Sequence, residues 1–283
     1  MSVALMSGKE PAARVFAEVS REAAAMQPAP GLAVIQVGED PASSVYVNMK
    51  EKRCRECGIR SQVFRLPENT PEDELAELIE TLNADDSVDA MLIQLPLPKH
   101  INETLMIELI DPAKDADCFH PYNLGRLAAG CPLVLPCTPA GVLAMLDHYA
   151  IAIEGKHALV IGRSNIVGKP LGLMLLARHA SVTWAHSRTQ DLPALCRAAD
   201  LVFVAIGKPR FLTAEMIKPG AVVVDVGINR IAEGDGYVLA GDADFEGLRE
   251  RASWITPVPG GVGAMTIAML LSNCVHLARL ARV

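Results

Sequence analysis

Apolar segments short enough for buried strands alternate with longer amphipathic segments through the first hundred residues of the chain. The apolar runs predict strands at 32–37, 61–66 and 88–95, and helical patterns predict helices at 10–26, at 43–57 and from residue 70 onward. In that third helix, Thr70 is expected to cap the N-terminus, with Pro71 at the first helical position. Strands that alternate with helices predict a parallel sheet.

The alternation returns in the second half, after a segment at 111–139 that reads as a long irregular loop. A helix is expected at 139–149, and apolar runs predict strands at 157–162, 180–186, 200–206, 221–227 and 254–255. Such an alternation is typical of a doubly wound nucleotide-binding sheet. An apolar helix over 263–280 ends the chain. We expect an α/β protein of two domains, because 283 residues exceed the usual size of one core.

Composition narrows the class of protein. Hydrophobic residues make up 51% of the chain and charged residues 21%, which suits a well-buried α/β protein rather than a disordered one. The net charge of -7 argues against a general nucleic-acid or membrane surface. The N-terminus shows no basic segment leading into an apolar core, and no uninterrupted apolar run approaches the roughly 20 residues of a membrane span. We therefore expect a cytoplasmic protein.

The seven cysteines are scattered, which fits reduced thiols in a reducing compartment. Cys54 and Cys57 form a CxxC pair, but no second pair follows at the spacing of a zinc site. The pair also closes a predicted helix, whereas a redox pair opens one. We interpret these two residues as thiols that pack a helix, and we predict no metal site.

A glycine turn at 162–168 is the candidate nucleotide site. The apolar run ending at Ile161 predicts a strand before Gly162, and a helix is expected to open at Gly168. Amides at the start of such a helix can hold a pyrophosphate. A tight turn that binds no ligand is the alternative.

The residues after the second strand of that unit indicate which nucleotide is bound. An NAD site usually has an acid there, to bond the ribose hydroxyl. Here the run from 184 to 189 contains no acid, and Ser187 and Arg188, helped by Arg163, could accept a 2′-phosphate. We therefore predict NADP; the alternative is that Arg188 is merely solvated.

Four residues of the first half suggest a substrate site. Tyr46 and Lys50 lie one helical turn apart, so a flat substrate could stack on the ring while the amine reaches its reactive carbon. Gln94 ends a strand, where open parallel sheets place ligands. Asp117 could bind the edge of a pterin-like ring, although the neighbouring Asp115 might equally be a loop cap. Taken singly, Lys50 could be a solvated charge and Gln94 an ordinary residue.

The glycine-rich segment at 257–266 follows the last predicted strand. Its glycines allow close approach of the backbone to a ligand. We favour a substrate-binding loop over a flexible hinge, because the segment lies at the C-terminal end of a strand.

At this point the residues resemble a known family, the bifunctional methylenetetrahydrofolate dehydrogenase/cyclohydrolases, over essentially the whole chain. The matching motifs are Ser43-x-x-Tyr46-Val-x-x-Lys50, Gln94-Leu-Pro-Leu-Pro98, Lys114-Asp-Ala-Asp117, Pro136-Cys-Thr-Pro139, Gly162-Arg-Ser-x-Ile-Val-Gly-Lys-Pro170 and Pro259-Gly-Gly-Val-Gly263. The resemblance implies oxidation of 5,10-methylenetetrahydrofolate by NADP⁺ to the methenyl cation, followed by hydrolysis to 10-formyltetrahydrofolate. It implies no nucleic-acid or membrane partner.

The resemblance also assigns roles to residues. It implies that Lys50 is central to the hydrolase step, that Tyr46 stacks on the folate, that Gln94 tunes the lysine and that Asp117 holds the pterin. The implied substrate-binding residues are Tyr46, Val47, Asn48, Met49, Lys50, Ile93, Gln94, Leu95, Pro259, Gly260, Gly261, Val262 and Gly263. The implied cofactor-binding residues are Gly162, Arg163, Ser164, Ser187 and Ile228, and the run from 184 to 189 adds Arg188.

The family's layout implies a folate-binding catalytic domain at 1–138, joined by the C-terminal helix at 264–283, and a Rossmann-type NADP domain at 139–263. It also implies a homodimer. Two departures flank the folate site, because Cys118 and Ala264 stand where the family usually has Gly and Pro. Cys118 is expected to restrict its loop, since only glycine visits positive φ freely; Ala264 removes a fixed φ. Two rival functions are another NADP dehydrogenase, acting on a small hydroxy acid, and a non-catalytic NADP-binding regulator.

Overall fold

The computed structural model describes residues 3–234 and 236–282. The chain forms two units, which we name after their sheets. The six-stranded unit consists of Met1–Ala13 and Thr138–Thr266, and the three-stranded unit consists of Arg14–Cys137 and Ile267–Val283. The first 13 residues thus group with the six-stranded unit, whereas the expected domain at 1–138 joins them to the other one.

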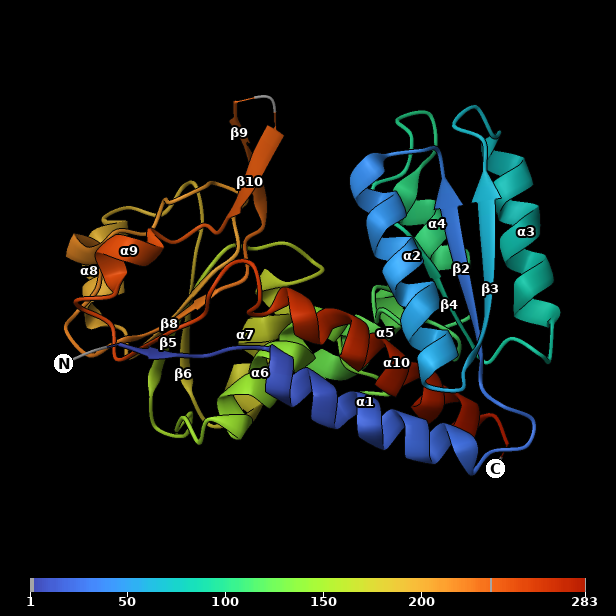
Figure 1. Ribbon diagram of the computed structural model, residues 1–283, viewed down its shortest axis with the longest axis horizontal. Helices are drawn as coiled ribbons and strands as arrows, with labels where there is room; N and C mark the ends of the chain where they lie inside the picture. Colours follow the sequence, from blue (N-terminus) through green and yellow to red (C-terminus); the bar gives the residue numbers. More distant parts are fainter. Residues whose placement is uncertain (1–2, 235, 283) are drawn as a thin grey trace. The chain divides into compact units, whose positions relative to one another are not determined.

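The three-stranded unit has three layers. Strands β2 (Gly31–Val37), β3 (Arg60–Leu66) and β4 (Ala90–Ile93) form a parallel sheet in the order β3-β2-β4. Alternate side chains of β2 and β4 enter two separate cores, as the two faces of a strand require. One core includes residues of α1 (Lys9–Ala24), α2 (Pro41–Glu56) and α10 (Gly263–Leu280), and the other includes α3 (Glu72–Ala84) and α4 (Glu103–Leu109). The sheet therefore lies between two layers of helices (Figure 1).

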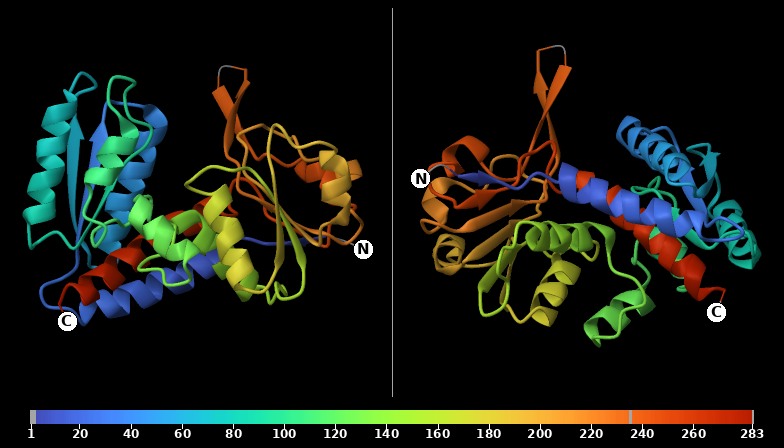
Figure 2. Two further views of the ribbon diagram at one scale, coloured as in Figure 1. Left: turned by 180° about the vertical axis from the view of Figure 1, so that it is seen from behind. Right: turned by 60° about the horizontal axis from the view of Figure 1, so that its bottom comes forward.

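All strands of the six-stranded sheet run parallel, in the order β1-β11-β8-β7-β5-β6. They are β1 (Ala4–Leu5), β5 (His157–Ile161), β6 (Ser181–Ala185), β7 (Leu201–Val204), β8 (Val222–Asp225) and β11 (Trp254–Ile255). The other elements of the unit are α6 (Cys137–His148), α7 (Gly168–Ala177), α8 (Leu192–Ala198), a 3₁₀ helix at Ala214–Met216, and α9 (Phe245–Leu248). Strands β9 (Asn229–Glu233) and β10 (Gly236–Ala240) form an antiparallel hairpin that projects from this unit (Figure 2).

The α/β alternation predicted from the sequence is confirmed, two details of the prediction are wrong, and some elements were not predicted at all. Helix α3 begins at Glu72, with Pro71 at the cap position, because the Thr70 hydroxyl donates to Pro67 O at 2.7 Å instead of capping the helix. The supposed loop at 111–139 contains α5 (Pro121–Ala128), which His120 caps by accepting from Tyr122 N at 3.0 Å. The hairpin and β1 were not anticipated.

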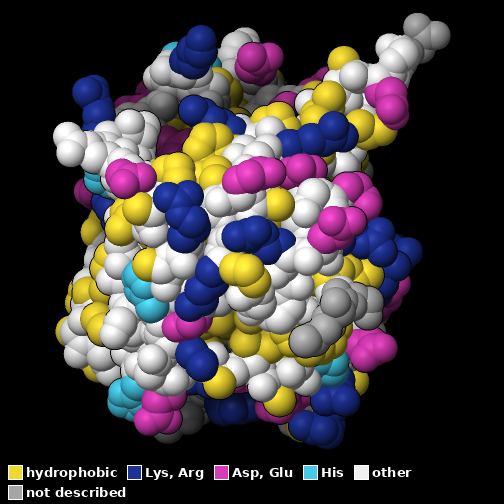
Figure 3. Space-filling view, turned by 90° about the vertical axis from the view of Figure 1, so that its left-hand side faces the viewer, with side chains coloured by type: hydrophobic (Ala, Val, Ile, Leu, Met, Phe, Trp, Pro, Cys, Tyr) yellow, Lys and Arg dark blue, Asp and Glu magenta, His cyan; other side chains and the backbone are white. Residues whose placement is uncertain are grey.

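Helix α10 returns to the three-stranded unit beyond Thr266 and packs there with α1, as expected. Among the described residues it is the one helix that is long and apolar enough to cross a membrane by length and composition. However, 56% of it is buried inside the protein, and Leu270, Leu271 and Cys274 belong to a hydrophobic core. We therefore interpret it as a core helix. On the face drawn in Figure 3, basic and acidic side chains are interspersed, so neither sign dominates that face.

Candidate active site

Gln94 lies at the point where the three-stranded sheet changes its winding direction. The chain passes from β2 to β3 on one side and then to β4 on the other, so the carboxyl ends of β2 and β4 form a switch point, where such sheets bind ligands. Gln94 N donates to Ile35 O at 2.7 Å, which continues the strand pairing by one residue. Ala90 and Leu92 face the core shared with α2, and the alternation places Gln94 on that same side.

Helix α2 brings Lys50 to Gln94. Asp40 starts the helix by accepting from Ser43 N at 2.7 Å. Lys50 lies on the same face as the buried Val47 and Cys54, which are three residues before it and four residues after it, so its side chain is only 7% exposed. The Lys50 Nζ donates to Gln94 Oε1 at 3.0 Å.

The orientation of the Gln94 amide is set by its second hydrogen bond. Gln94 Nε2 donates to Leu95 O at 2.8 Å, so Oε1 is the atom that faces the Lys50 ammonium. Tyr46, one turn before Lys50, is half-buried and packs against the same core. The structure therefore brings together an aromatic ring, an amine and an amide at the switch point.

Asp117 reaches the same edge of the sheet through an additional strand-like segment. Met91 N donates to Lys114 O at 2.7 Å, and Ala116 N donates to Met91 O at 3.1 Å. These bonds run in the parallel sense, which carries Asp117 toward the carboxyl end of β4. Lys114 itself is structural: its Nζ donates to the carbonyls of Leu82, Asn83 and Asp85 at the end of α3.

The structure distinguishes the two neighbouring aspartates. Asp115 is buried and accepts hydrogen bonds from Phe119 N at 3.2 Å, His120 N at 2.9 Å and Asn123 Nδ2 at 3.0 Å. Burial raises the pKa of the Asp115 carboxyl, and these hydrogen bonds oppose the change. Asp115 is therefore a loop cap, and Asp117, which is half-buried, remains the candidate for ligand binding.

Cys137 shares the electrostatic environment of this site. Burial raises the pKa of its thiol well above the ordinary value; the negative charge of Asp117 adds to the increase, and the charge of Lys50 opposes it. Cys137 is therefore a neutral thiol close to both charged groups. In the sequence, Cys137 is visible only as part of the Pro136-Cys-Thr-Pro139 motif, which by itself indicates no role for the thiol.

The other substrate-site residues predicted on α2 and β4 are not all directed to this point. Val47 is fully buried in the core, and Asn48 accepts from Arg65 Nη2 at 2.9 Å. Ile93 enters the core on the opposite face of the sheet from Gln94. The helical repeat turns Asn48 away from Lys50, and the strand repeat turns Ile93 away from Gln94, whereas Val47 shares the buried face of α2 with Lys50 and enters the core. Met49 is 41% exposed, and Leu95 packs beside the core that holds Ile93.

The six-stranded sheet has its own switch point, between β5 and β7. The chain moves from β5 to β6 on one side and then to β7 on the other. Gly162 directly follows β5 at φ +134°, and a Cβ there would collide with Ala205 O after β7. A Cβ on Gly168 would collide with Gly162 O. Both positions therefore require glycine, and the turn leaves space at the ends of the two strands.

That space is a cavity of about 470 Å³. It is lined by Ile161, Gly162, Arg163, His186, Ser187, Thr189, Leu192, Ala205, Ile206, Lys208 and Phe211. No described lining residue is acidic. Asp191, the first acid after β6, instead caps α8 by accepting from Ala194 N at 3.3 Å. Lys208 and His186, which follow β7 and β6, were not among the expected cofactor residues, although Lys208 comes just after one predicted strand and His186 ends another.

Three of the six predicted cofactor residues, Gly162, Arg163 and Ser187, line the cavity, and the other three do not. Ser164 Oγ accepts from Val167 N and Gly168 N, both at 3.2 Å, and so holds the start of α7. Arg188 is exposed just after β6, and Ile228 is 44% exposed before the hairpin.

The glycines at 259–263 are required by packing within the six-stranded unit. Gly8 N donates to Gly260 O at 2.9 Å, and Gly260 has φ +100°. A Cβ on Gly261 would collide with Pro257 O, and a Cβ on Gly263 would lie 3.1 Å from Ile228 Cδ1. Val262 is buried, and Val258 and Pro259 are joined by a cis peptide bond. Close backbone packing thus accounts for these glycines without a hinge.

These features define a class of protein: a two-domain α/β enzyme with a buried lysine at one switch point and a nucleotide-type cavity at another. Two family models match the chain, the tetrahydrofolate dehydrogenase/cyclohydrolase catalytic domain over residues 6–117 and the NAD(P)-binding domain of the same family over residues 136–282. The chain belongs to the tetrahydrofolate dehydrogenase/cyclohydrolase family. The resemblance found in the sequence is therefore confirmed.

Relatives cover nearly the whole chain. The bifunctional protein FolD of Nitratidesulfovibrio vulgaris is 56% identical over an alignment of 280 positions that covers 96% of this chain and 96% of that protein. The crystal structure of Campylobacter jejuni FolD is 48% identical with a TM-score of 0.94, and that of Trypanosoma brucei FolD, complexed with NADP cofactor and inhibitor, is 36% identical with a TM-score of 0.95. Both structures match 100% of this chain and 100% of their own.

Proposed function

We propose that this protein oxidises 5,10-methylenetetrahydrofolate with NADP and then hydrolyses the methenyl product to 10-formyltetrahydrofolate. Family membership supports both activities. The observation that carries the proposal is the buried hydrogen bond from Lys50 Nζ to Gln94 Oε1 at a switch point. A lysine rarely lies so deep without a partner or a chemical role.

Lys50 is the group that serves the hydrolase step. The methenyl cation is already electrophilic, so water adds to its bridging carbon. The bond from that carbon to N5 then breaks as the added oxygen becomes the formyl carbonyl and N5 takes up a proton, so that one of the two water protons is released overall. Lys50 Nζ lies where it can exchange that proton, because Gln94 Oε1 holds the amine in one direction and leaves its remaining positions for the substrate. Tyr46 supplies a ring for stacking, and Asp117 supplies acceptors for the amino and ring N–H edge of the pterin.

NADP fits the cavity at the end of β5 and β7. Gly162 leaves room for a pyrophosphate at the start of α7, and Arg163, Ser187 and Lys208 supply donors for phosphate groups. When bound, NADP accepts the hydride that the methylene carbon loses. Arg188, exposed at the end of β6, is assigned to the 2′-phosphate.

The decisive experiment follows methenyl formation and decay spectrophotometrically in the protein and in Lys50→Met. The variant should lose hydrolysis while it still folds and binds NADP, because methionine keeps an unbranched side chain of nearly the same length and removes the amine. Lys52→Met is the matched control: Lys52 is on the same helix, with a side chain 74% exposed. Full hydrolysis by Lys50→Met would refute the assignment of Lys50 to the hydrolase step. If the unaltered protein forms no methenyl product, the two rival functions are favoured: a dehydrogenase acting on a small hydroxy acid, or a non-catalytic NADP-binding regulator.

We further propose that the protein is a cytoplasmic homodimer. The family resemblance and the composition support this, and equilibrium sedimentation of the purified protein tests the dimer. A single species of about 30.3 kDa, the mass of one chain, would contradict it.

A further inference from the structure

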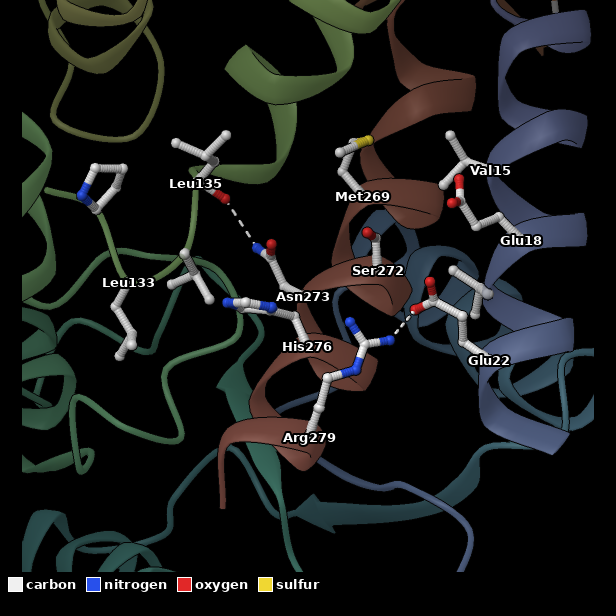
Figure 4. Close-up of a pocket in the computed structure, with 13 residues that line it drawn as sticks. Val15, Glu18, Glu22, Leu133, Leu135, Met269, Ser272, Asn273, His276 and Arg279 are labelled. Carbon is white, nitrogen blue, oxygen red and sulfur yellow. Dashed lines mark hydrogen bonds and ion pairs between the residues drawn. The ribbon is translucent and has the colours of Figure 1, made fainter. Parts of the chain in front are cut away.

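One residue of α10 connects two backbone segments beside the proposed folate site. Asn273 is 7% exposed, and its Nδ2 donates to Ala116 O and to Leu135 O, both at 2.8 Å. Figure 4 shows the amide reaching from the helix toward Leu135. An amide nitrogen has two hydrogens, and both are therefore used. Ala116 directly precedes Asp117, so one of the two bonds fixes the peptide next to the proposed pterin ligand.

Two thiols join the same segments more weakly. Cys118 Sγ donates to Val134 O at 3.4 Å, and Cys137 Sγ donates to Ala116 O at 3.4 Å. Thiols are weak donors, so the amide of Asn273 supplies the strongest of these links. Asp117 thus lies between two residues that are tied to the 134–137 segment.

We propose that Asn273 is a positioning residue for folate recognition, acting through Ala116 on Asp117. The inference rests on the proposed role of Asp117. Recognition of the flat edge of a pterin requires both carboxylate oxygens to be aligned with its donors, so a small shift of the peptide lowers affinity for the folate. Without Asn273, Ala116 O keeps only the thiol of Cys137, and Leu135 O loses its amide donor.

The surroundings of Asn273 allow a clean substitution. Asn273 lines a hollow of about 460 Å³ between α1, α10 and residues 132–135 (Figure 4). Leucine has the same branched skeleton as asparagine but is bulkier, and the hollow gives the new side chain room while both donors are removed. Ser272→Ala is the matched control, because Ser272 lines the same hollow one residue earlier.

The test compares steady-state constants of the dehydrogenase for both substrates. Asn273→Leu should raise KM for methylenetetrahydrofolate about tenfold or more, as expected when a ligand-positioning group is displaced. KM for NADP should stay within about twofold of the unaltered value on the same reasoning, and Ser272→Ala should match the unaltered protein. Asn273→Ser retains one short donor and should fall between the two.

A double variant shows whether Asn273 acts through Asp117. If it does, Asn273→Leu should add little to the KM of Asp117→Ala; the same tenfold increase in both backgrounds would overturn the proposal. If KM for methylenetetrahydrofolate is unchanged in Asn273→Leu but raised in Asp117→Ala, the positioning role of Asn273 is rejected and the proposed role of Asp117 stands. An unchanged KM in Asp117→Ala would reject the proposed role of Asp117 itself. Should Asn273→Leu not fold, Asn273→Ser carries the same test, and an unchanged KM there also overturns the inference.

Discussion

Cys118 adopts a backbone conformation that ordinarily belongs to glycine. Its φ is +60°, and its side chain is fully buried, with the thiol donating to Val134 O. A left-handed conformation costs a residue with a Cβ about 1–2 kcal/mol, whereas glycine adopts it freely. The structure therefore agrees with the concern raised by the sequence, that a cysteine at the family's glycine position would restrict this loop.

The perturbation that isolates this cost is a comparison of Cys118→Ala with Cys118→Gly. Both variants lose the same thiol and the same hydrogen bond, so those losses largely cancel, and the remaining difference reports the Cβ. We expect glycine to be more stable than alanine by about 1 kcal/mol at this position. Cys274, fully buried within α10, is the matched control: there alanine should be more stable than glycine by about 1 kcal/mol, because the backbone is helical.

Urea unfolding of the four variants measures both differences. The protein has two tryptophans, Trp184 and Trp254, and both are in the six-stranded unit, so far-UV circular dichroism is the better probe of the unit that holds Cys118. The preference for glycine over alanine should have opposite signs at positions 118 and 274, about 2 kcal/mol apart. Equal signs at both positions would show that residue 118 is not left-handed in solution.

Two further predictions concern the six-stranded unit. Arg188→Ala should lower kcat/KM for NADP by about tenfold or more and leave the rate with NAD unchanged, because only NADP carries a 2′-phosphate. Initial rates with the two cofactors measure this. A strong NAD preference of the unaltered protein would reverse the assignment of the cofactor. Burial raises the pKa of the Asp225 carboxyl from 3.8 to about 6. The neutral carboxyl is therefore favoured in the folded protein, and relative to high pH it adds about 3 kcal/mol to the free energy of unfolding below about pH 4. This stabilisation is lost as the pH rises through 6. Asp225→Asn should flatten the pH dependence of urea unfolding between pH 4 and 7, and an unchanged slope would contradict the pKa.

The parts of the fold that follow from local pattern were predictable. Strand and helix repeats are visible in the sequence, and the switch-point rule then places Gln94 and the turn at Gly162 at ligand-binding edges. The buried face of α2 also follows from its repeat, since Val47, Lys50 and Cys54 share one side. Strand β1 was not predictable in this way, because its two residues pair with β11, about 250 positions further along the chain.

Local sequence pattern does not predict which of Asp115 and Asp117 is the candidate ligand-binding residue. The two carboxylates are two residues apart and look alike in sequence. What separates them is the start of α5, where the amides of Phe119 and His120 turn back to Asp115. That turn has a sequence signal in Pro121 at the first helical position of α5, because the amides just before a helix start need side-chain acceptors, and Asp115 supplies them for Phe119 and His120.

No such signal exists for Asn273. It is 157 residues from Ala116, and in the sequence it looks like any other polar residue of a largely apolar helix. Its importance arises only because the segments at 116–118 and 134–137 are joined there through side-chain donors to backbone carbonyls. Family motifs mark the groups that touch a ligand, whereas the groups that hold those motifs in place can lie on any element that happens to pack beside them. A buried amide with both hydrogens donated to the backbone next to a candidate ligand is therefore the physical feature by which such residues can be found.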